Sequence, residues 1–155
     1  MENIIFRSAE DMKKYAADFA GSLSGGTILA LTGELGSGKT TFVQGLAKGF
    51  GVPGAVNSPT FNIMKLYNTG DSCEAGPDSE GTVKRLYHID CYRLDNPHDL
   101  AGLGFHEWIK DAEGVVAIEW AEKIREILPS RAIRFRFEAG EESERKMIIE
   151  NDPRK

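Results

Sequence analysis

Apolar residues recur at helical spacing in two parts of the chain. The first part follows Ser8, and Asp11, three residues later, resembles the acidic partner of a capping box. The second part runs from Thr41 to Phe50, before Gly51 and Pro53, which are typical of a helix end. The spacing predicts two helices, carried by Met12, Tyr15, Ala16, Phe19 and Leu23 in the first and by Phe42, Val43, Leu46, Ala47 and Phe50 in the second.

Shorter apolar runs predict strands. Thr27–Thr32 and Val115–Glu119 are continuous apolar runs of the kind that buried parallel strands show. Residues 133–137 alternate apolar side chains with arginines, and a further apolar run follows at Met147–Ile149. This order predicts an antiparallel finish to the sheet.

The middle of the chain predicts a hairpin and then helical turns. Phe61–Tyr67 and Lys84–Arg93 are typical of two antiparallel strands. Residues 68–82 between them are rich in Gly, Asp, Ser and Glu and predict a flexible polar loop. Asn96–Ile109 predicts helical turns, and residues 151–155 predict a disordered tail.

Composition and charge limit the kind of protein. A length of 155 residues predicts a single domain, 1–155. The formal net charge of -5 argues against broad affinity for nucleic acid or acidic membranes. Cys73 and Cys91 lack CxxC spacing, which predicts reduced thiols. Residues 1–18 carry charges throughout, so we expect a cytoplasmic protein without membrane contact.

A glycine-rich segment carries the strongest functional signal. Residues 33–40 read Gly-Glu-Leu-Gly-Ser-Gly-Lys-Thr and match the phosphate-binding pattern G-x-x-x-x-G-K-[ST]. Gly33, Gly36 and Gly38 supply the backbone freedom that lets successive N–H groups surround phosphate oxygens. The helix that begins here directs its positive end at the anion.

The two residues that close this loop also suit a nucleotide. Lys39 can reach the β- and γ-phosphates, and Thr40 can give its hydroxyl to Mg²⁺. A plain glycine turn is the alternative, but a predicted strand before the loop and a helix after it favour the nucleotide site. The element order predicts an α/β, P-loop NTPase-like three-layer fold with a mixed, mostly parallel central sheet and additional antiparallel strands.

Glu119 is the first candidate for chemistry beyond the loop. Nucleotide hydrolysis needs a carboxylate near Mg²⁺ and a group that positions water. Glu119 ends an apolar strand, and ligands of open α/β folds bind at the carboxyl ends of the strands. The alternative is an ordinary charge at a strand end.

A second polar cluster occurs in residues 88–93, His-Ile-Asp-Cys-Tyr-Arg. On an extended strand His88, Asp90 and Tyr92 would share one face. Asp90 could bind Mg²⁺ indirectly or orient water, with His88 holding Asp90 by a hydrogen bond. The cluster could equally be the hydrogen-bonded surface of a hairpin.

Two further segments have both a functional and a structural interpretation. Ser58-Pro59-Thr60 lies after the second predicted helix, where P-loop switch proteins place a segment whose hydroxyl can sense Mg²⁺ or the γ-phosphate, although this composition is also common in turns. Trp120 could stack on a base or fill the core.

Taken together and in order, the glycine-rich loop, Ser58–Phe61, His88–Arg93 and Ile118–Trp120 closely resemble the bacterial TsaE (YjeE) family. The resemblance covers about residues 5 to 150. It implies a Mg²⁺-dependent ATPase that hydrolyses ATP and supports the synthesis of threonylcarbamoyladenosine beside the anticodon of tRNAs reading A-starting codons. It also implies a complex with the proteins TsaB and TsaD, through which tRNA is reached indirectly, and no transfer of the threonylcarbamoyl group by this chain itself.

The resemblance further implies roles for individual residues. Asp90 becomes the favoured hydrolysis residue, and Thr60 the switch position. Thr40 and Glu119 are the implied Mg²⁺ ligands. The implied nucleotide contacts are Gly33, Gly36, Ser37, Gly38, Lys39, Thr40 and Thr41 around the phosphates, with Trp120 as a pocket wall and Arg145 as a further contact. The chain departs from the family at Met12, where Thr is frequent, and in its long loop 68–82.

Two other classes of protein share the phosphate-binding loop. A GTP-controlled switch would need a base-reading Asn-Lys-x-Asp, which the sequence lacks. D-x-x-G matches such as those at residues 78–81 and 111–114 do not follow a buried strand. A small-molecule kinase would need an arginine-bearing lid and an acceptor pocket, and the sequence identifies neither.

Overall fold

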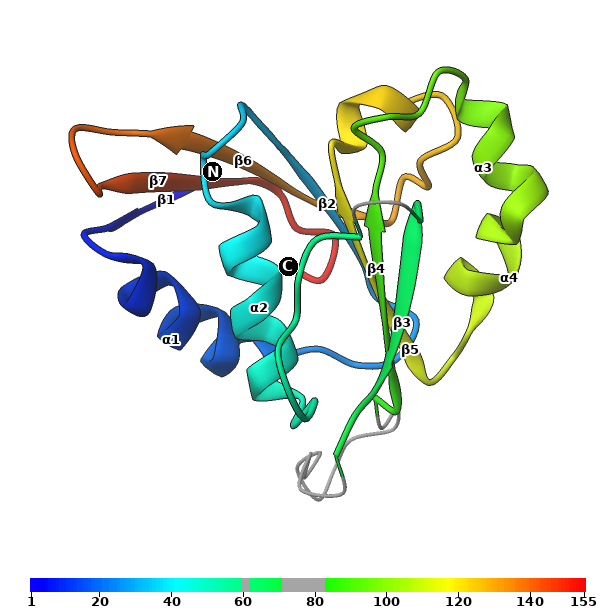
Figure 1. Cartoon of the computed structure of the whole chain (residues 1–155), viewed down its shortest axis with the longest axis horizontal. Coiled ribbons are helices and arrows are strands. Elements are labelled where there is room, and N and C mark those ends of the chain that lie inside the picture. The colour runs from blue at the N-terminus through cyan, green and yellow to red at the C-terminus, as the bar shows by residue number, and fades with distance from the viewer. Residues whose placement is uncertain (60–61, 71–82) are drawn as a thin grey trace.

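The computed structural model describes residues 1–59, 62–70 and 83–155, and a mixed seven-stranded sheet organises these residues (Figure 1). The strand order is β1-β7-β6-β2-β5-β4-β3. The strands are β1 (Glu2–Phe6), β2 (Ile28–Gly33), β3 (Met64–Asn68), β4 (Arg85–Asp90), β5 (Gly114–Glu119), β6 (Ile133–Ala139) and β7 (Arg145–Asn151).

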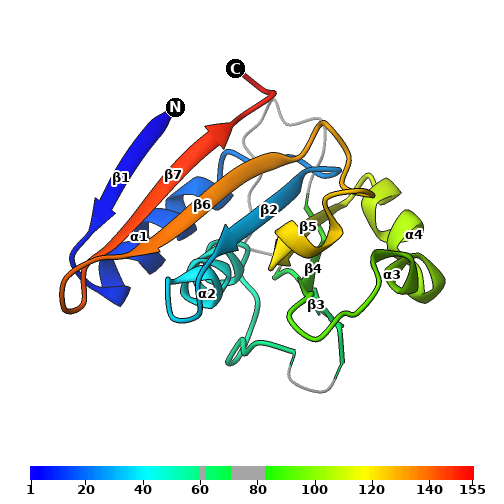
Figure 2. The same ribbon diagram turned by 90° about the horizontal axis from the view of Figure 1, so that it is seen from above.

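Helices cover both faces of the sheet and complete three layers (Figures 1 and 2). Helices α1 (Ala9–Ala20) and α2 (Lys39–Gly49) pack together on one face. The opposite face carries α3 (Pro97–Leu103), α4 (Phe105–Lys110) and the short 3₁₀ helix η1 (Ala121–Ile124). Each face has its own hydrophobic core, so the predicted three-layer α/β fold is confirmed.

The sheet is parallel at its centre and antiparallel at both sides. Strands β6, β2, β5 and β4 pair in parallel, whereas β3 pairs antiparallel with β4, and β7 pairs antiparallel with β6 and β1. The predicted hairpin and the antiparallel finish are therefore present. The parallel centre brings the carboxyl ends of β2, β4 and β5 to one edge of the sheet.

The two predicted N-terminal helices form with shifted ends. Ser8 caps α1 by accepting a 3.1 Å hydrogen bond from the Asp11 N–H, as the capping-box pattern indicated. The α1 helix ends at Ala20, before Leu23, because the N–H groups of Gly21, Ser22 and Leu23 bond to carbonyls three residues earlier, which tightens the chain into turns. The α2 helix begins two residues before the predicted start, at Lys39.

Strand β1 was missing from the sequence prediction. It has only five residues, at the edge of the sheet, and pairs with β7 from the far end of the chain. Ile4 and Phe6 face the core beside α1, but Ile5 between them is 60% exposed. A single short alternation of this kind is too weak to distinguish a strand from an extended terminus.

The predicted middle strands are longer than the observed ones. Strand β3 begins at Met64, and β4 ends at Asp90 because a turn follows, closed by the bond from Leu94 N to Cys91 O. The helical turns expected at 96–109 are the separate helices α3 and α4, divided by Gly104 at φ 116°. Residues 71–82 of the predicted polar loop, with Cys73, lie outside the described residues.

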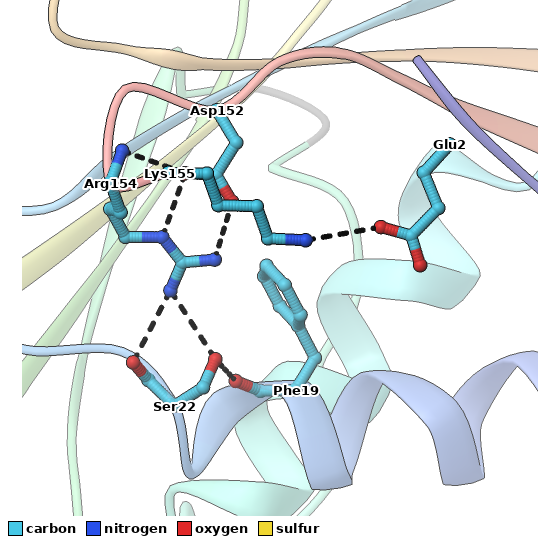
Figure 3. A network of polar contacts seen from close by, with 6 residues as sticks. All are labelled: Glu2, Phe19, Ser22, Asp152, Arg154 and Lys155. Carbon is cyan, nitrogen blue, oxygen red and sulfur yellow. Dashed lines mark hydrogen bonds and ion pairs between the residues drawn. The ribbon is translucent and has the colours of Figure 1, made fainter.

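The C-terminal residues differ from the predicted disordered tail. Arg154 donates hydrogen bonds to Asp152 Oδ2 at 2.7 Å and to the Ser22 carbonyl at 3.2 Å, and its guanidinium lies over the Phe19 ring at 5.3 Å (Figure 3). Lys155 approaches Glu2 at 3.3 Å. These contacts hold the tail against α1 and β1.

Within the described part of the chain, none of the helices has the length and apolar character needed to cross a membrane.

Candidate functional site

A pocket of about 430 Å³ lies where α2 begins and where β4 and β5 end. Its volume is within the range of small-molecule sites. It is lined by Ala9, Met12, Leu35, Gly36, Ser37, Gly38, Lys39, Thr40, Thr41, Ser58, Asp90, Tyr92, Glu119, Trp120, Ser143 and Arg145. Most of the predicted site residues are therefore gathered in one place.

The glycine-rich loop has the backbone that its sequence predicted. Gly36 and Gly38 have φ values of 77° and 112°, in the left-handed region that side chains disfavour. A Cβ on Gly38 would lie 2.6 Å from Met12 Cε, and one on Gly33 would lie 2.4 Å from the Phe137 carbonyl oxygen. The loop is thus a close-fitting backbone cradle at the positive end of α2, and its geometry fits a phosphate group.

Lys39 is buried at the base of this cradle, with 4% of its surface exposed. Its ammonium donates to the carbonyls of Gly33 at 2.5 Å and Glu34 at 2.9 Å, and it lies 4.1 Å from the centre of the Trp120 ring. Burial lowers the pKa of Lys39, and the negative charge of Glu119 opposes that shift. An incoming phosphate would offer this ammonium a charged partner in place of neutral carbonyls.

Three side chains from different elements form a hydrogen-bonded chain beside the loop. Thr40 on α2 donates its hydroxyl to Glu119 Oε1 at 2.7 Å, and Glu119 Oε2 lies 2.5 Å from His88 Nε2. Glu119 ends β5, and His88 belongs to the neighbouring β4. The contact between His88 and Glu119 depends on the parallel register of these two strands.

The oxygens of Thr40 and Glu119 suit a magnesium ion. Neighbouring ligands of octahedral Mg²⁺, each about 2.0–2.1 Å from the metal, are about 2.9 Å apart, close to the 2.7 Å found here. The described residues contain no cluster of three or more His, Cys, Asp or Glu side chains that would hold a metal alone. Mg²⁺ typically takes one or two protein oxygens and completes its shell with phosphates and water, so this donor set fits it.

Asp90 lies on the strand next to Glu119, with the two residues in register. Its Oδ2 accepts a hydrogen bond from the Ser58 hydroxyl at 2.7 Å, and its Oδ1 accepts one from the Tyr92 N–H at 2.9 Å. The predicted bond between His88 and Asp90 is wrong, since the observed partner of His88 is Glu119. His88 and Asp90 are two residues apart on β4, so their side chains point to the same face of the sheet. They do not bond to each other there: His88 contacts Glu119, and Asp90 contacts Ser58.

The switch prediction at Thr60 falls outside the described residues. Ser58, two residues earlier, lines the pocket and contacts Asp90. Ser58 belongs to the predicted Ser-Pro-Thr segment, but nothing in the sequence marks Ser58 itself as a site residue. The 32-residue separation between Ser58 and Asp90 in the chain explains why the pairing was missed.

Trp120 both lines the pocket and packs against the hydrophobic core on the α3 side of the sheet. It therefore has the position of a pocket wall and also contributes to the core. It has φ 58°, a left-handed conformation that turns the chain directly after Glu119. The Trp120 ring lies 5.0 Å from the Tyr92 ring. Tyr92 follows the end of β4, so it does not share a strand face with His88 and Asp90 as predicted. Tyr92 is half exposed, so the pair forms an aromatic wall open to solvent.

Arg145, at the start of β7, reaches the loop from the other side. Its Nε donates to the Gly36 carbonyl at 2.9 Å, and its Nη1 donates to the Glu144 carbonyl at 2.8 Å. Ser143 also lines the pocket, and no motif around it in the sequence predicts this position. Met12 also lines the pocket, where its thioether offers apolar contact in place of a hydroxyl donor.

Two sequence features lie away from the pocket chemistry. Asp111, in one D-x-x-G match, precedes β5 at the opposite end of that strand from Glu119 and is bonded to Arg85 and Tyr87, so it serves structure. Cys91 is buried, and burial raises its pKa to about 12, which keeps it a thiol.

The phosphate-binding loop, between a central parallel strand and a helix, defines a P-loop α/β protein. Comparison with known families makes this more specific: residues 6–147 match the model of "Threonylcarbamoyl adenosine biosynthesis protein TsaE". The chain therefore belongs to the TsaE family, whose role lies in the biosynthesis of threonylcarbamoyladenosine in tRNA.

Individual relatives support the assignment over nearly the whole chain. A TsaE protein of Bacillus subtilis is 37% identical over 140 residues, which cover 90% of this chain and 79% of the relative. One from Treponema pallidum is 30% identical over 145 residues, covering 94% and 97%. The crystal structure of Bacillus subtilis YdiB superposes with a TM-score of 0.70 at 31% identity, covering 94% of this chain and 82% of that one.

Proposed function

We propose that this chain is a Mg²⁺-dependent ATPase that supports threonylcarbamoyladenosine modification of tRNAs reading A-starting codons, in a complex with TsaB and TsaD. The chain hydrolyses ATP to ADP and phosphate and does not itself transfer the threonylcarbamoyl group. The observation that carries the proposal is the 2.7 Å contact between Thr40 and Glu119 at the phosphate loop, with Asp90 in register beside Glu119.

Each group at the pocket has a part in this reaction. The backbone of residues 36–41 and the Lys39 ammonium hold the phosphates. Thr40 and Glu119 hold Mg²⁺, which when bound neutralises developing charge on the phosphate oxygens. Asp90, fixed by Ser58, orients the attacking water, because phosphoryl transfer depends chiefly on positioning and electrostatics.

The outer residues complete the nucleotide site. Trp120 forms one wall of the pocket, and Arg145 contacts the nucleotide at the rim of the loop. Thr60 senses the γ-phosphate and, with the β3–β4 hairpin, changes the affinity for TsaB and TsaD when that phosphate is lost. Equal affinity of the TsaB and TsaD assembly for the chain loaded with ADP or with a non-hydrolysable ATP analogue would contradict this coupling.

Reconstitution tests the proposed function. Modified tRNA is measured over many turnovers with tRNA, TsaB, TsaD, ATP and a supplied threonylcarbamoyl donor, in the presence of the wild-type chain, of Lys39→Ala, or of no chain. We expect sustained modification only with the wild type. Lys48→Ala is the matched control, because Lys48 is an exposed lysine on the same helix, outside the pocket. Full modification with Lys39→Ala would overturn the proposal, and calorimetric preference for GTP over ATP would overturn the choice of nucleotide.

A further inference from the structure

His88 is a buried polar residue next to the nucleotide pocket that does not line it. Its side chain is fully buried on β4, opposite Ala117 of β5 in the strand register. Its Nε2 lies 2.5 Å from Glu119 Oε2. His88 is not among the residues that surround the pocket, but its partner Glu119 is.

The two oxygens of Glu119 have separate partners. Oε1 accepts the hydroxyl hydrogen of Thr40 at 2.7 Å, while Oε2 meets the His88 ring. A glutamate at a strand end has three side-chain torsions, and one contact alone would leave its carboxylate free to rotate. The two contacts together fix the carboxylate plane and direct Oε1 at Thr40.

The other nitrogen of the ring indicates which way the hydrogen bond runs. Among the described residues no group bonds to His88 Nδ1, which is buried. A proton on Nδ1 would be a buried donor without an acceptor, which is costly. The tautomer with hydrogen on Nε2 avoids this cost and donates to a carboxylate, which is an acceptor when ionised.

We propose that His88 is a positioning residue that locks Glu119 into the orientation in which its Oε1, together with the Thr40 hydroxyl, receives Mg²⁺. The arrangement is a histidine–carboxylate pair behind a metal ligand, the reverse of the common case in which a carboxylate supports a ligating histidine. This inference rests on the proposed nucleotide site. It means that β4 contributes two residues to that site: Asp90, which orients water, and His88, which positions Glu119.

The test compares His88→Leu with His88→Gln by calorimetry. Nucleotide affinity is measured without Mg²⁺ and over a Mg²⁺ series. Loss of an outer-shell partner typically weakens metal affinity by about 10–100-fold, and we expect a shift of this size in the Mg²⁺ requirement of His88→Leu. Affinity without Mg²⁺ stays unchanged. His88→Gln recovers most of the Mg²⁺ response, because its amide nitrogen can donate from the place of Nε2.

Two controls separate positioning from general damage to the strand. Leu86→Val alters the same buried face of β4 two residues earlier and should lower stability while leaving the Mg²⁺ response unchanged. In a Glu119→Gln background, His88→Leu should cause no further loss of Mg²⁺ response, since the two residues act as one unit. Full additivity of the two losses would contradict action through Glu119.

A measurement on the wild-type protein covers the case in which His88→Leu does not fold. Nitrogen-15 NMR of the His88 ring should show hydrogen on Nε2 and none on Nδ1, and the Nε2–H signal should move when Mg²⁺ is added to the nucleotide complex. Hydrogen on Nδ1, or an Nε2–H signal whose chemical shift does not change when Mg²⁺ is added, would overturn the inference.

The outcomes also separate this inference from the proposed function. If the wild type binds no nucleotide, the proposed function itself fails. If the wild type responds to Mg²⁺ and His88→Leu responds at the same concentrations, only the role of His88 is refuted.

Discussion

Lys39 illustrates how one residue is prepared for a ligand. Its ammonium is buried against two backbone carbonyls and the face of Trp120, and burial lowers its pKa. Neutral carbonyls compensate a buried cation less well than a charged phosphate does. The buried ammonium therefore gains more from a bound phosphate than an exposed lysine would.

We expect Lys39→Ala to weaken ATP binding by about 10–100-fold, because a hydrogen bond to a charged group contributes about 1.5–3 kcal/mol. Calorimetric titration with ATP and Mg²⁺ measures the change. Lys48→Ala, on the exposed side of the same helix, should bind as the wild type does. Wild-type affinity in Lys39→Ala would contradict the role given to this lysine.

Individual site residues could be predicted from the sequence where a given residue type at a fixed spacing performs the chemistry. The loop glycines, Lys39 and Thr40 follow one local pattern, and Glu119 follows from its place at the end of an apolar strand. The partner of His88 could not be predicted in this way. The choice between Asp90 and Glu119 depends on the register between β4 and β5, which only the folded sheet defines.

At the scale of elements, close packing of α1 on α2 places the loop and Met12 together. Gly45 in α2 allows this approach, because a Cβ there would lie 2.6 Å from both Ala16 Cβ and the Lys13 carbonyl oxygen. The two helices form the layer that covers the core of β2 and β6. A glycine inside a helix is intrinsically unfavourable, and here tight packing accounts for it.

We therefore expect Gly45→Ala to lower the free energy of unfolding by about 1–3 kcal/mol, the usual cost of overpacking. Gly102→Ala in α3 is the matched control, because a Cβ built there has no described atom within 4 Å apart from its chain neighbours and the backbone of its own helix. That change should raise stability by about 0.4–1 kcal/mol. Urea unfolding measures both, and a stabilised Gly45→Ala protein would show that the helices separate easily.

A second element contact joins the start of β4 to the turn before β5. Asp111 accepts hydrogen bonds from Arg85 Nε at 2.6 Å, Arg85 Nη2 at 2.9 Å and the Tyr87 hydroxyl at 2.7 Å. The Arg85 hydrogen bonds hold the pKa of Asp111 well below its usual value of 3.8, against the opposing effect of burial. This cluster fastens the sheet at the end opposite the pocket.

The lowered pKa gives the cluster a defined pH dependence. Because the folded form holds the proton less tightly than the unfolded form, the stabilisation is fully present above about pH 4 and is lost as the pH falls further. Asp111→Asn should melt below the wild type at pH 6, and the difference should shrink as the pH falls from 4 toward 2. A constant difference in Tm across this range would contradict the assignment.

The sequence predicted most elements because long periodic runs, such as those of α1 and α2, and a continuous apolar run, such as that of β5, carry strong signals. Strand β1 was missed because its pairing partner is β7, at the other end of the chain. The end of β4 was placed too late, because the apolar Cys91 extends the pattern although the chain already turns there. Strand ends set by tertiary hydrogen bonds leave little trace in local composition.

At the scale of the whole molecule, strand order creates the site. The central order β6-β2-β5-β4 places Glu119 between the loop that follows β2 and Asp90 at the end of β4. The sequence predicted the class of fold but not this order, since parallel strands are joined by long crossovers that do not specify neighbours. The C-terminal tail is held in place by the contact between Arg154 and the Phe19 ring, which joins residues that are far apart in the sequence.

The proposed hydrolysis of ATP in the pocket depends on Asp90. Phosphate release from ATP and Mg²⁺, measured beside calorimetric ATP affinity, tests this claim in the wild type, Asp90→Ala and Asp90→Asn. We expect both variants to bind ATP nearly as the wild type does and to release phosphate at least about 100-fold more slowly, the size of effect that a positioned catalytic group supplies. Wild-type phosphate release from Asp90→Ala, at undiminished ATP affinity, would contradict the account.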